Sequence, residues 1–162
     1  MNHTPSEFPS DIDRRQFVLQ AGRACGFLTV ATIMQACGNP GSSSGSSGTP
    51  LSTANGTVSS GVVSVSIPAG SALDSVGGMA LIQTPSNGSF LATRTAQTTF
   101  SILTATCTHE GCTVTGFSGT TFVCPCHGSR YSTSGGVVNG PATRALQTFN
   151  SQFSNGVLTF SL

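Results

Sequence analysis

Two short segments gather the side chains of this sequence that can bind a soft metal ion. Box one is Cys107-Thr108-His109-Glu110-Gly111-Cys112, and box two, after eleven intervening residues, is Cys124-Pro125-Cys126-His127-Gly128-Ser129-Arg130-Tyr131. Each box offers two thiols and one imidazole. Thiolate and imidazole suit zinc or an iron–sulfur centre, whereas calcium and magnesium prefer oxygen ligands. The boxes therefore predict a centre with soft ligands carried on two loops.

Three kinds of centre are compatible with these residue types. A structural zinc site needs four ligands and would leave two cysteines over. A β domain stapled by disulfides would make both histidines bystanders. A [2Fe-2S] centre can take two cysteines at one iron and two histidines at the other. The last centre is favoured because His109 and His127 stand at ligand spacing, each followed within two residues by glycine.

The Cys-x-His of box one and the Cys-x-x-His of box two resemble the Rieske [2Fe-2S] family. The resemblance implies that Cys107 and Cys124 bind a buried iron, whereas His109 and His127 bind an outer, more exposed iron. It also implies one [2Fe-2S] cluster per subunit. The fold it implies is an antiparallel β-sandwich of short strands with two cluster-binding loops.

The resemblance extends to residues beyond the four ligands. It implies that Cys112 and Cys126 form a disulfide that ties the two loops together, which suits an exported protein. Ser129 and Tyr131 stand where hydroxyl groups donate hydrogen bonds to a cluster sulfide and a ligand sulfur in high-potential members. Such donors offset added negative charge and raise the reduction potential.

A third segment, residues 135–142, resembles the loop that covers one side of the cluster in this family. Its turn is Gly140-Pro141, and the ring of Pro141 stiffens such a cover. Family members often carry a second proline where this chain has Thr143, so we expect a less rigid loop. The clear resemblance spans about residues 106–142.

The N-terminal segment resembles an export signal. The pair Arg14-Arg15, followed by Phe17 and an apolar stretch at 24–34, resembles a twin-arginine signal, which exports proteins already folded around a cofactor. That stretch is too short for a bilayer-spanning helix, which needs about 20 apolar residues. Met34-Gln35-Ala36-Cys37 resembles a lipobox, in which Cys37 receives a lipid. We therefore expect a lipid-anchored protein in the periplasm or on the outer face of the cytoplasmic membrane.

Three regions follow from this organisation. Residues 1–37 are the predicted twin-arginine signal peptide with its lipobox. Residues 38–55 are the predicted flexible tether, because 38–50 contain Gly, Ser, Pro, Asn and Thr alone. Residues 56–162 are the predicted metal-binding domain. Cys25 and His3 are expected to be removed with the signal peptide. Apart from Cys37, the cysteines and histidines of the mature chain then all lie in the two boxes.

The composition predicts an all-β fold and excludes nucleic acid as a partner. Charged residues make up 7% of the chain and the net charge is +1, far from the basic balance that nucleic acid requires. Ser, Thr, Gly and Val dominate from Ser42 onward, and they favour short strands and turns over helices. Runs of β-forming residues, bounded by turn residues, predict strands at 58–67, 79–83, 90–93, 100–105, 121–123 and 157–162.

A cluster of this kind transfers one electron and has no substrate pocket. We therefore expect an electron carrier, or a subunit of a quinol:cytochrome c or molybdenum-type respiratory oxidoreductase, and no stand-alone catalyst. The expected partners are a quinol-side donor and a cytochrome or copper-protein acceptor. Glu110 argues against direct quinol oxidation, because the matching position in cytochrome bc complexes is usually apolar. The alternative function is a zinc- or disulfide-stabilised extracytoplasmic binding module without redox activity.

Overall fold

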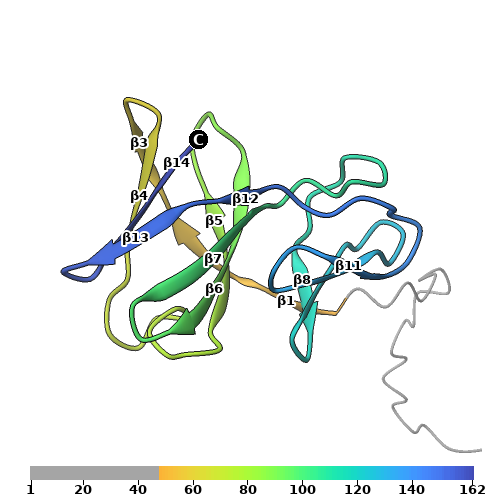
Figure 1. The fold of residues 1–162 in the computed structure, drawn as a ribbon, viewed down its shortest axis with the longest axis horizontal. Helices are drawn as coiled ribbons and strands as arrows, with labels where there is room; N and C mark the ends of the chain where they lie inside the picture. Colours follow the sequence, from red (N-terminus) through yellow and green to blue (C-terminus); the bar gives the residue numbers. More distant parts are fainter. Residues whose placement is uncertain (1–47) are drawn as a thin grey trace, which may run out of the picture. The chain divides into compact units, whose positions relative to one another are not determined.

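The structure is a computed structural model that describes residues 48–162, in which the chain forms fourteen strands in three sheets (Figure 1). Sheet A has the order β1 (Thr49–Pro50), β8 (Gly116–Ser118), β9 (Thr121–Val123), β10 (Arg130–Ser132), β11 (Val137–Asn139). Sheet B has the order β12 (Thr148–Phe149), β7 (Thr99–Thr104), β6 (Ser89–Ala96), β5 (Met79–Gln83), β2 (Ser52–Asn55). Sheet C has the order β13 (Ser151–Ser154), β14 (Val157–Ser161), β4 (Val62–Ser66), β3 (Thr57–Ser59). The described residues form no helix, which confirms the predicted all-β class.

Sheet B is the middle layer, because both of its faces are buried. On one face, Leu81, Leu91 and Leu103 lie side by side across β5, β6 and β7 and pack in the core shared with sheet A. On the other face, Ile82 and Phe90 pack in the core shared with sheet C. Successive side chains of a strand point to opposite faces. Five consecutive buried residues in β6 follow from that rule, since this strand is covered on both sides.

All six predicted strands are present in the structure, and one of them is divided into two strands. Val63 and Val65 alternate with serines in the sequence, and both valines are buried in β4. The predicted strand at 58–67 is wrong as a single strand. Ser60 and Gly61 both adopt positive φ, 50° and 77°, and they turn the chain into the β3–β4 hairpin. A Ser-Gly pair is a turn signal inside an otherwise β-rich run.

The predicted boundary of the tether at residue 55 is also wrong. Residues 49–55 hold β1 and β2, which pair with β8 and β5, and Leu51 between them is buried in the core. The pairing of β2 with β5 is parallel, a departure from the expected antiparallel sandwich. The predicted signal peptide, the lipidation of Cys37 and residues 38–47 lie outside the described part of the chain. From residue 48 to 162 there is no helix that could span a membrane.

Candidate metal centre

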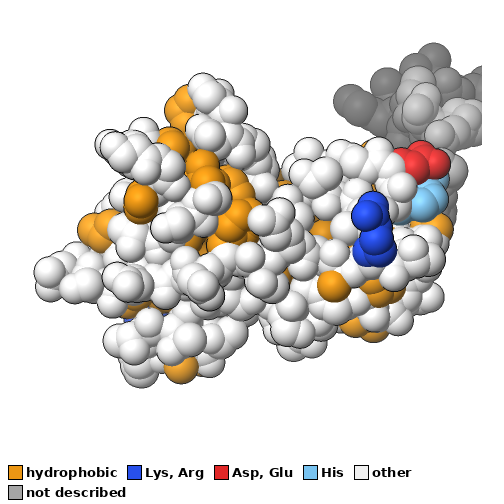
Figure 2. All heavy atoms as spheres, turned by 45° about the horizontal axis from the view of Figure 1, so that its top comes forward, with side chains coloured by type: hydrophobic (Ala, Val, Ile, Leu, Met, Phe, Trp, Pro, Cys, Tyr) orange, Lys and Arg blue, Asp and Glu red, His pale blue; other side chains and the backbone are white. Residues whose placement is uncertain are grey.

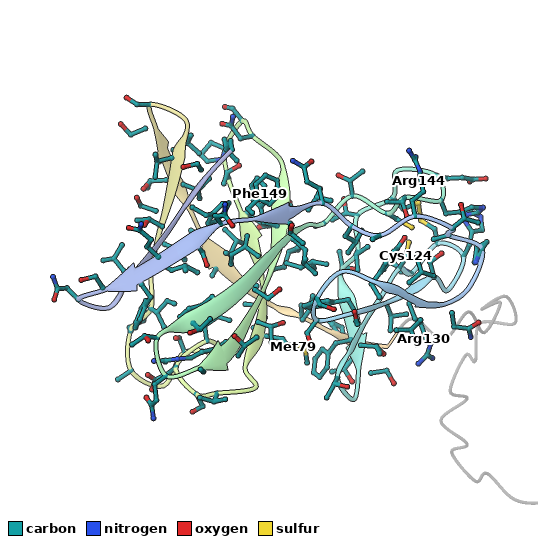
Figure 3. The ribbon with its side chains drawn as sticks, viewed as in Figure 1. Met79, Cys124, Arg130, Arg144 and Phe149 are labelled. Atoms are coloured by element: carbon teal, nitrogen blue, oxygen red, sulfur yellow. A yellow bond between two sulfur atoms is a disulfide. The ribbon has the colours of Figure 1, made fainter. Side chains whose placement is uncertain are left out.

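Sheet A brings the two boxes together at one of its ends. Box one lies in the connection from β7 to β8, which is closed at its base by an antiparallel bridge between Thr106 and Thr113. Box two connects β9 to β10, an antiparallel pair in which Val123 lies opposite Arg130. Figure 3 shows the sulfur atoms gathered beside Cys124 at this end of the molecule. The bridge below box one and the β9–β10 hairpin thus position the two loops side by side.

The backbone of both loops follows one hydrogen-bonding pattern. In box one, the N–H of Cys107 donates to the carbonyl of Cys112 at 2.8 Å, and the carbonyl of Cys107 accepts from Gly111 at 2.8 Å. Cys124 makes the same two bonds in box two, with the residues five and four positions on. Gly111 and Gly128 have φ of 76° and 73°, a conformation that glycine adopts without strain. The glycine after each histidine therefore shapes its loop.

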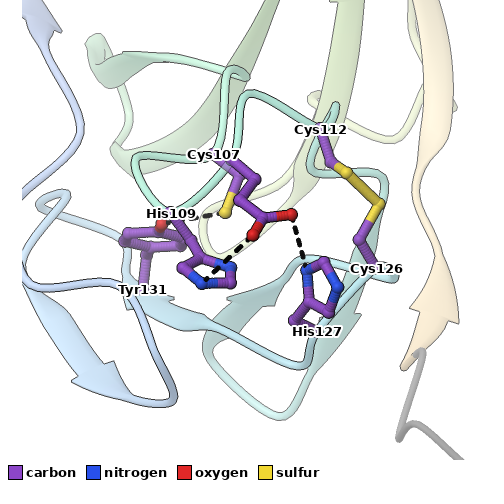
Figure 4. The surroundings of a disulfide bond; sticks show 7 residues. Cys107, His109, Cys112, Cys126, His127 and Tyr131 are labelled. Carbon is purple, nitrogen blue, oxygen red and sulfur yellow. Dashed lines mark hydrogen bonds and ion pairs between the residues drawn. A yellow bond between two sulfur atoms is a disulfide. The ribbon is translucent and has the colours of Figure 1, made fainter.

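The four cysteines of the boxes fall into two pairs. Cys112 and Cys126 form a disulfide, which confirms the predicted link between the loops (Figure 4). Cys107 and Cys124 are free thiols and are buried, with exposed fractions of 3% and 1%. The structure thus leaves one thiol from each box facing the protein interior, as a pair of metal ligands requires.

The two free thiols differ in how readily they ionise. Burial raises the pKa of Cys107, but hydrogen bonds to its sulfur, led by that from Tyr131, outweigh this and bring the pKa below its ordinary value. Burial raises the pKa of Cys124, and the neighbouring Cys107 raises it further. Cys107 therefore loses its proton first. A bound cation is the natural means of drawing off the proton of Cys124, because metals bind thiolates.

The two histidines lie at the outer side of the site. The side chains of His109 and His127 are 26% and 48% exposed, and their ring centroids are 4.9 Å apart with the planes nearly perpendicular. The Nδ1 atom of His109 is buried without a hydrogen-bond partner. A buried polar atom ordinarily has a partner, so a metal at this nitrogen would complete its surroundings. The donor set of two thiols and two imidazoles fits an iron–sulfur centre of mixed ligation.

Hydroxyl groups surround the sulfur of Cys107. The Tyr131 hydroxyl lies 3.2 Å from Cys107 Sγ and accepts a hydrogen bond from the N–H of Thr108 at 3.1 Å (Figure 4). The Ser129 hydroxyl accepts a hydrogen bond from the N–H of Ala142 at 3.2 Å, and its closeness to Cys107 helps to lower the pKa of that thiol. Of the two predicted tuning residues, Tyr131 is therefore in hydrogen-bond contact with a candidate ligand, and Ser129 lies nearby with its hydroxyl bonded to Ala142. Thr108 was not among the predicted site residues, since nothing in its sequence position marks its contact with Tyr131.

The predicted cover loop packs directly against box two. Gly140 has a φ of 101°, and a Cβ atom built there would lie 2.6 Å from the Cα of Ser129. Pro141 follows on the exposed side, and Ala142 after it is buried. Two independent reasons thus require glycine at position 140: the left-handed backbone and the closeness of box two.

Replacing Gly140 with alanine is expected to push the cover loop away from box two. The added methyl group meets backbone atoms, which cannot turn aside as a flexible side chain can. We expect unfolding free energy to fall by about 1–3 kcal/mol, measured by chemical denaturation. Gly119→Ala is the matched control, because Gly119 also has a positive φ but has no atom within 4 Å of its Cβ position. Equal losses in the two variants would contradict the close packing of this loop.

Glu110 takes a position that the sequence did not predict. Its carboxylate lies between the two imidazoles, with Oε1 3.9 Å from His109 Nε2 and Oε2 3.8 Å from His127 Nδ1. The sequence identified Glu110 as unusual in its box but gave no sign of a contact with box two. That contact depends on the folding of the two loops against each other.

Similarity to known proteins covers the part of the chain that holds the site. Residues 74–150 match the model of the Rieske [2Fe-2S] domain. The cytochrome b6-f complex iron-sulfur subunit of Cyanothece sp. (strain PCC 7425) is 45% identical over 60 residues, which is 36% of this chain and 34% of that protein. The subunit of the same name from Prochlorococcus marinus (strain AS9601) is 58% identical over 45 residues, 27% of this chain and 25% of that protein. This chain thus spans about a quarter to a third of the length of these relatives.

Among solved structures, the plasma membrane Rieske protein PetC3 from Synechocystis PCC 6803 is 33% identical. The alignment covers 52% of this chain and 87% of that one, with a TM-score of 0.46. The matched segment of the family model contains both boxes with their cysteines and histidines. This chain therefore belongs to the Rieske [2Fe-2S] family, and its cofactor is a [2Fe-2S] cluster.

Proposed function

We propose that Cys107 and Cys124 bind one iron of the cluster and that His109 and His127 bind the other. The observation that carries this assignment is the division of burial. Both free thiols are enclosed, whereas both imidazoles reach the surface. The unpartnered Nδ1 of His109 supports it further.

The proposed protein transfers single electrons through this cluster. The exposed imidazole edges give a partner protein access to the outer iron, and the buried thiolates hold the inner iron away from water. Ser129 and Tyr131 raise the reduction potential through hydrogen bonds, because donors near sulfur stabilise the more negative reduced cluster. Gly140 and Pro141 cover one side of the site and keep solvent from it.

The proposed cellular setting is an exported protein tethered to a membrane. Its support is the order of the N-terminal residues, in which Arg14-Arg15, an apolar stretch and Cys37 precede a Gly- and Ser-rich segment. A lipid on Cys37 would anchor the chain outside the cytoplasm, and the segment from 38 to 47 would let the domain move between partners. The proposed partners are a quinol-side donor and a cytochrome or copper-protein acceptor. The matched relatives are themselves iron-sulfur subunits of cytochrome complexes.

The test uses the full chain, expressed in a host with a twin-arginine export system. Iron and zinc are assayed on the purified protein, and its absorption and electron paramagnetic resonance spectra are recorded before and after reduction. We expect two irons per chain and a rhombic signal of low average g in the reduced state, as for a histidine-ligated cluster. Zinc without a reducible chromophore would overturn electron transfer and favour the binding-module alternative.

Cellular location has a separate readout. The wild-type chain and a variant with Arg14 and Arg15 replaced by lysine are fractionated into cytoplasm, periplasm and membrane. We expect the wild type in the membrane fraction with its cluster and the variant in the cytoplasm. The variant Cys37→Ala is expected to leave the membrane fraction while keeping its cluster. A wild-type chain that stays in the cytoplasm would contradict the proposed export.

A further inference from the structure

In the described part of the chain the acidic side chains are Glu110 and Asp74, and Glu110 is the one that lies at the candidate metal centre. Asp74 lies in another region, where it accepts a hydrogen bond from Gly70 N–H and is 3.9 Å from the guanidinium of Arg94. Figure 2 shows an acidic side chain beside histidine at one end of the molecule. A full negative charge thus lies next to the proposed ligands, and no arginine is paired with it among the described ion pairs.

Glu110 contacts the two histidines through different ring nitrogens, Nε2 of His109 and Nδ1 of His127. Each carboxylate oxygen faces a different imidazole, at 3.9 Å for His109 and 3.8 Å for His127, and dashed lines in Figure 4 mark both ion pairs. The two rings stand nearly perpendicular, with the carboxylate between their nitrogens. Because the side chain comes from box one and contacts box two, it links the two loops at their outer side, in addition to the disulfide between Cys112 and Cys126.

We infer that Glu110 is a positioning residue that orients both histidines and lowers the reduction potential of the cluster. A carboxylate beside the non-ligating nitrogen of a histidine fixes its ring and makes it a stronger donor to the metal. Glu110 is so placed at Nε2 of His109, whose Nδ1 is the unpartnered donor. A stronger donor and a nearby negative charge both favour the oxidised cluster, since reduction adds another negative charge. Glu110 thus acts against Ser129 and Tyr131. The inference rests on the proposed function, because it requires His109 and His127 to be ligands.

With this role, the reduction potential depends on two opposing influences: hydroxyl groups that raise it and Glu110, which lowers it. Tyr131 and Ser129 act on the buried sulfur, whereas Glu110 acts on the exposed imidazoles. The two influences reach opposite irons of the proposed cluster. Removing the charge of Glu110 should therefore raise the reduction potential, whereas removing the hydroxyl of Tyr131 should lower it.

The test compares variants of the full chain at one fixed, neutral pH. Glu110→Gln keeps an oxygen that can accept from an imidazole N–H but removes the charge. The reduction potential is measured by protein-film voltammetry. We expect Glu110→Gln to shift the redox equilibrium three- to tenfold toward the reduced cluster, where tenfold equals about 59 mV for one electron. Asp74→Asn removes the same charge far from the site and is expected to leave the potential unchanged.

A second readout separates orientation from charge. Glu110→Leu removes both the charge and the accepting oxygen, so it should alter the nitrogen couplings of the two histidines in pulsed electron paramagnetic resonance. Glu110→Gln should keep those couplings close to the wild type while its potential rises. Unchanged potential in Glu110→Gln, or unchanged couplings in Glu110→Leu, would overturn the inference.

The failure of this inference can be told apart from the failure of the proposed function. If the wild-type chain carries two irons and a rhombic reduced signal, the cluster and its histidine ligation stand whatever Glu110 does. An equal potential in wild type and Glu110→Gln then refutes the role of Glu110 alone. If the wild type carries zinc and no reducible cluster, both proposals fail together.

Discussion

Replacing Cys112 and Cys126 together with serine is expected to make the cluster at least tenfold less durable. The disulfide is the covalent link between box one and box two, and its two cysteines are 14 positions apart in the sequence. Closing a loop of about this length contributes about 3 kcal/mol to stability. Each loop keeps its own backbone hydrogen bonds in the variant. Without the disulfide, however, the two loops and their proposed ligands can move apart, and water can reach the cluster.

The measurement is the decay of the visible absorption of the cluster in the air-oxidised protein at a fixed temperature, with iron per chain assayed in parallel. The double variant avoids a stray thiol that either single variant would leave. Thr106→Ser with Thr113→Ser is a control in the same loop, because it changes two side chains at the base of box one and leaves the disulfide intact. A double cysteine variant that holds two irons and decays at the wild-type rate would show that the disulfide is dispensable.

Much of this site could be predicted because its information is local in the sequence. Each box carries its thiols and imidazole within a few residues, and the glycine after each histidine marks the turn that the loop needs. The types and spacing of these side chains exclude most other metals. The pairing of Cys112 with Cys126 came from the family resemblance and is confirmed.

The parts that could not be predicted depend on contacts between distant segments. The carboxylate of Glu110 meets His127 because two hairpins pack together, and no local pattern encodes that meeting. Residues 49–55 were included in the predicted tether, which rested on the Gly- and Ser-rich composition of 38–50. Their strands are held by backbone hydrogen bonds to β8 and β5, with Leu51 as the buried anchor. Backbone pairing leaves little trace in composition.

The hairpin at residues 57–66 illustrates a different limit. A long run of valine, serine and isoleucine favours a strand on propensity alone, and the turn inside it depends on two residues, Ser60 and Gly61. Glycine within a strand pattern is compatible with a bulge, a close approach or a turn. β-forming residues on both sides of the pair are indeed in strands, so the element type was predicted although the strand was drawn too long.

Tyr131→Phe is expected to lower the reduction potential by about 60–120 mV, a ten- to hundredfold shift of the redox equilibrium. The hydroxyl of Thr108 donates its one proton to the carbonyl of Arg144 at 2.6 Å, because a carbonyl can only accept. The Tyr131 oxygen accepts from the Thr108 N–H, so its own proton is available to the sulfur of Cys107. Reduction places more negative charge on sulfur and strengthens that bond. Losing it therefore destabilises the reduced state.

The phenol remains a donor across the neutral range. Burial raises the pKa of Tyr131, and its contact with Cys107 raises the pKa further, so the hydroxyl keeps its proton. Phenylalanine fills nearly the same buried space, which keeps the fold, and thermal unfolding checks this. Ser132→Ala is the matched control, because it removes a hydroxyl from the next residue of β10, which contacts Ser134 and Gly136 instead of the site. An equal potential in Tyr131→Phe and wild type, with Ser132→Ala also unchanged, would mean that the tyrosine proton points to Thr108 rather than to the sulfur.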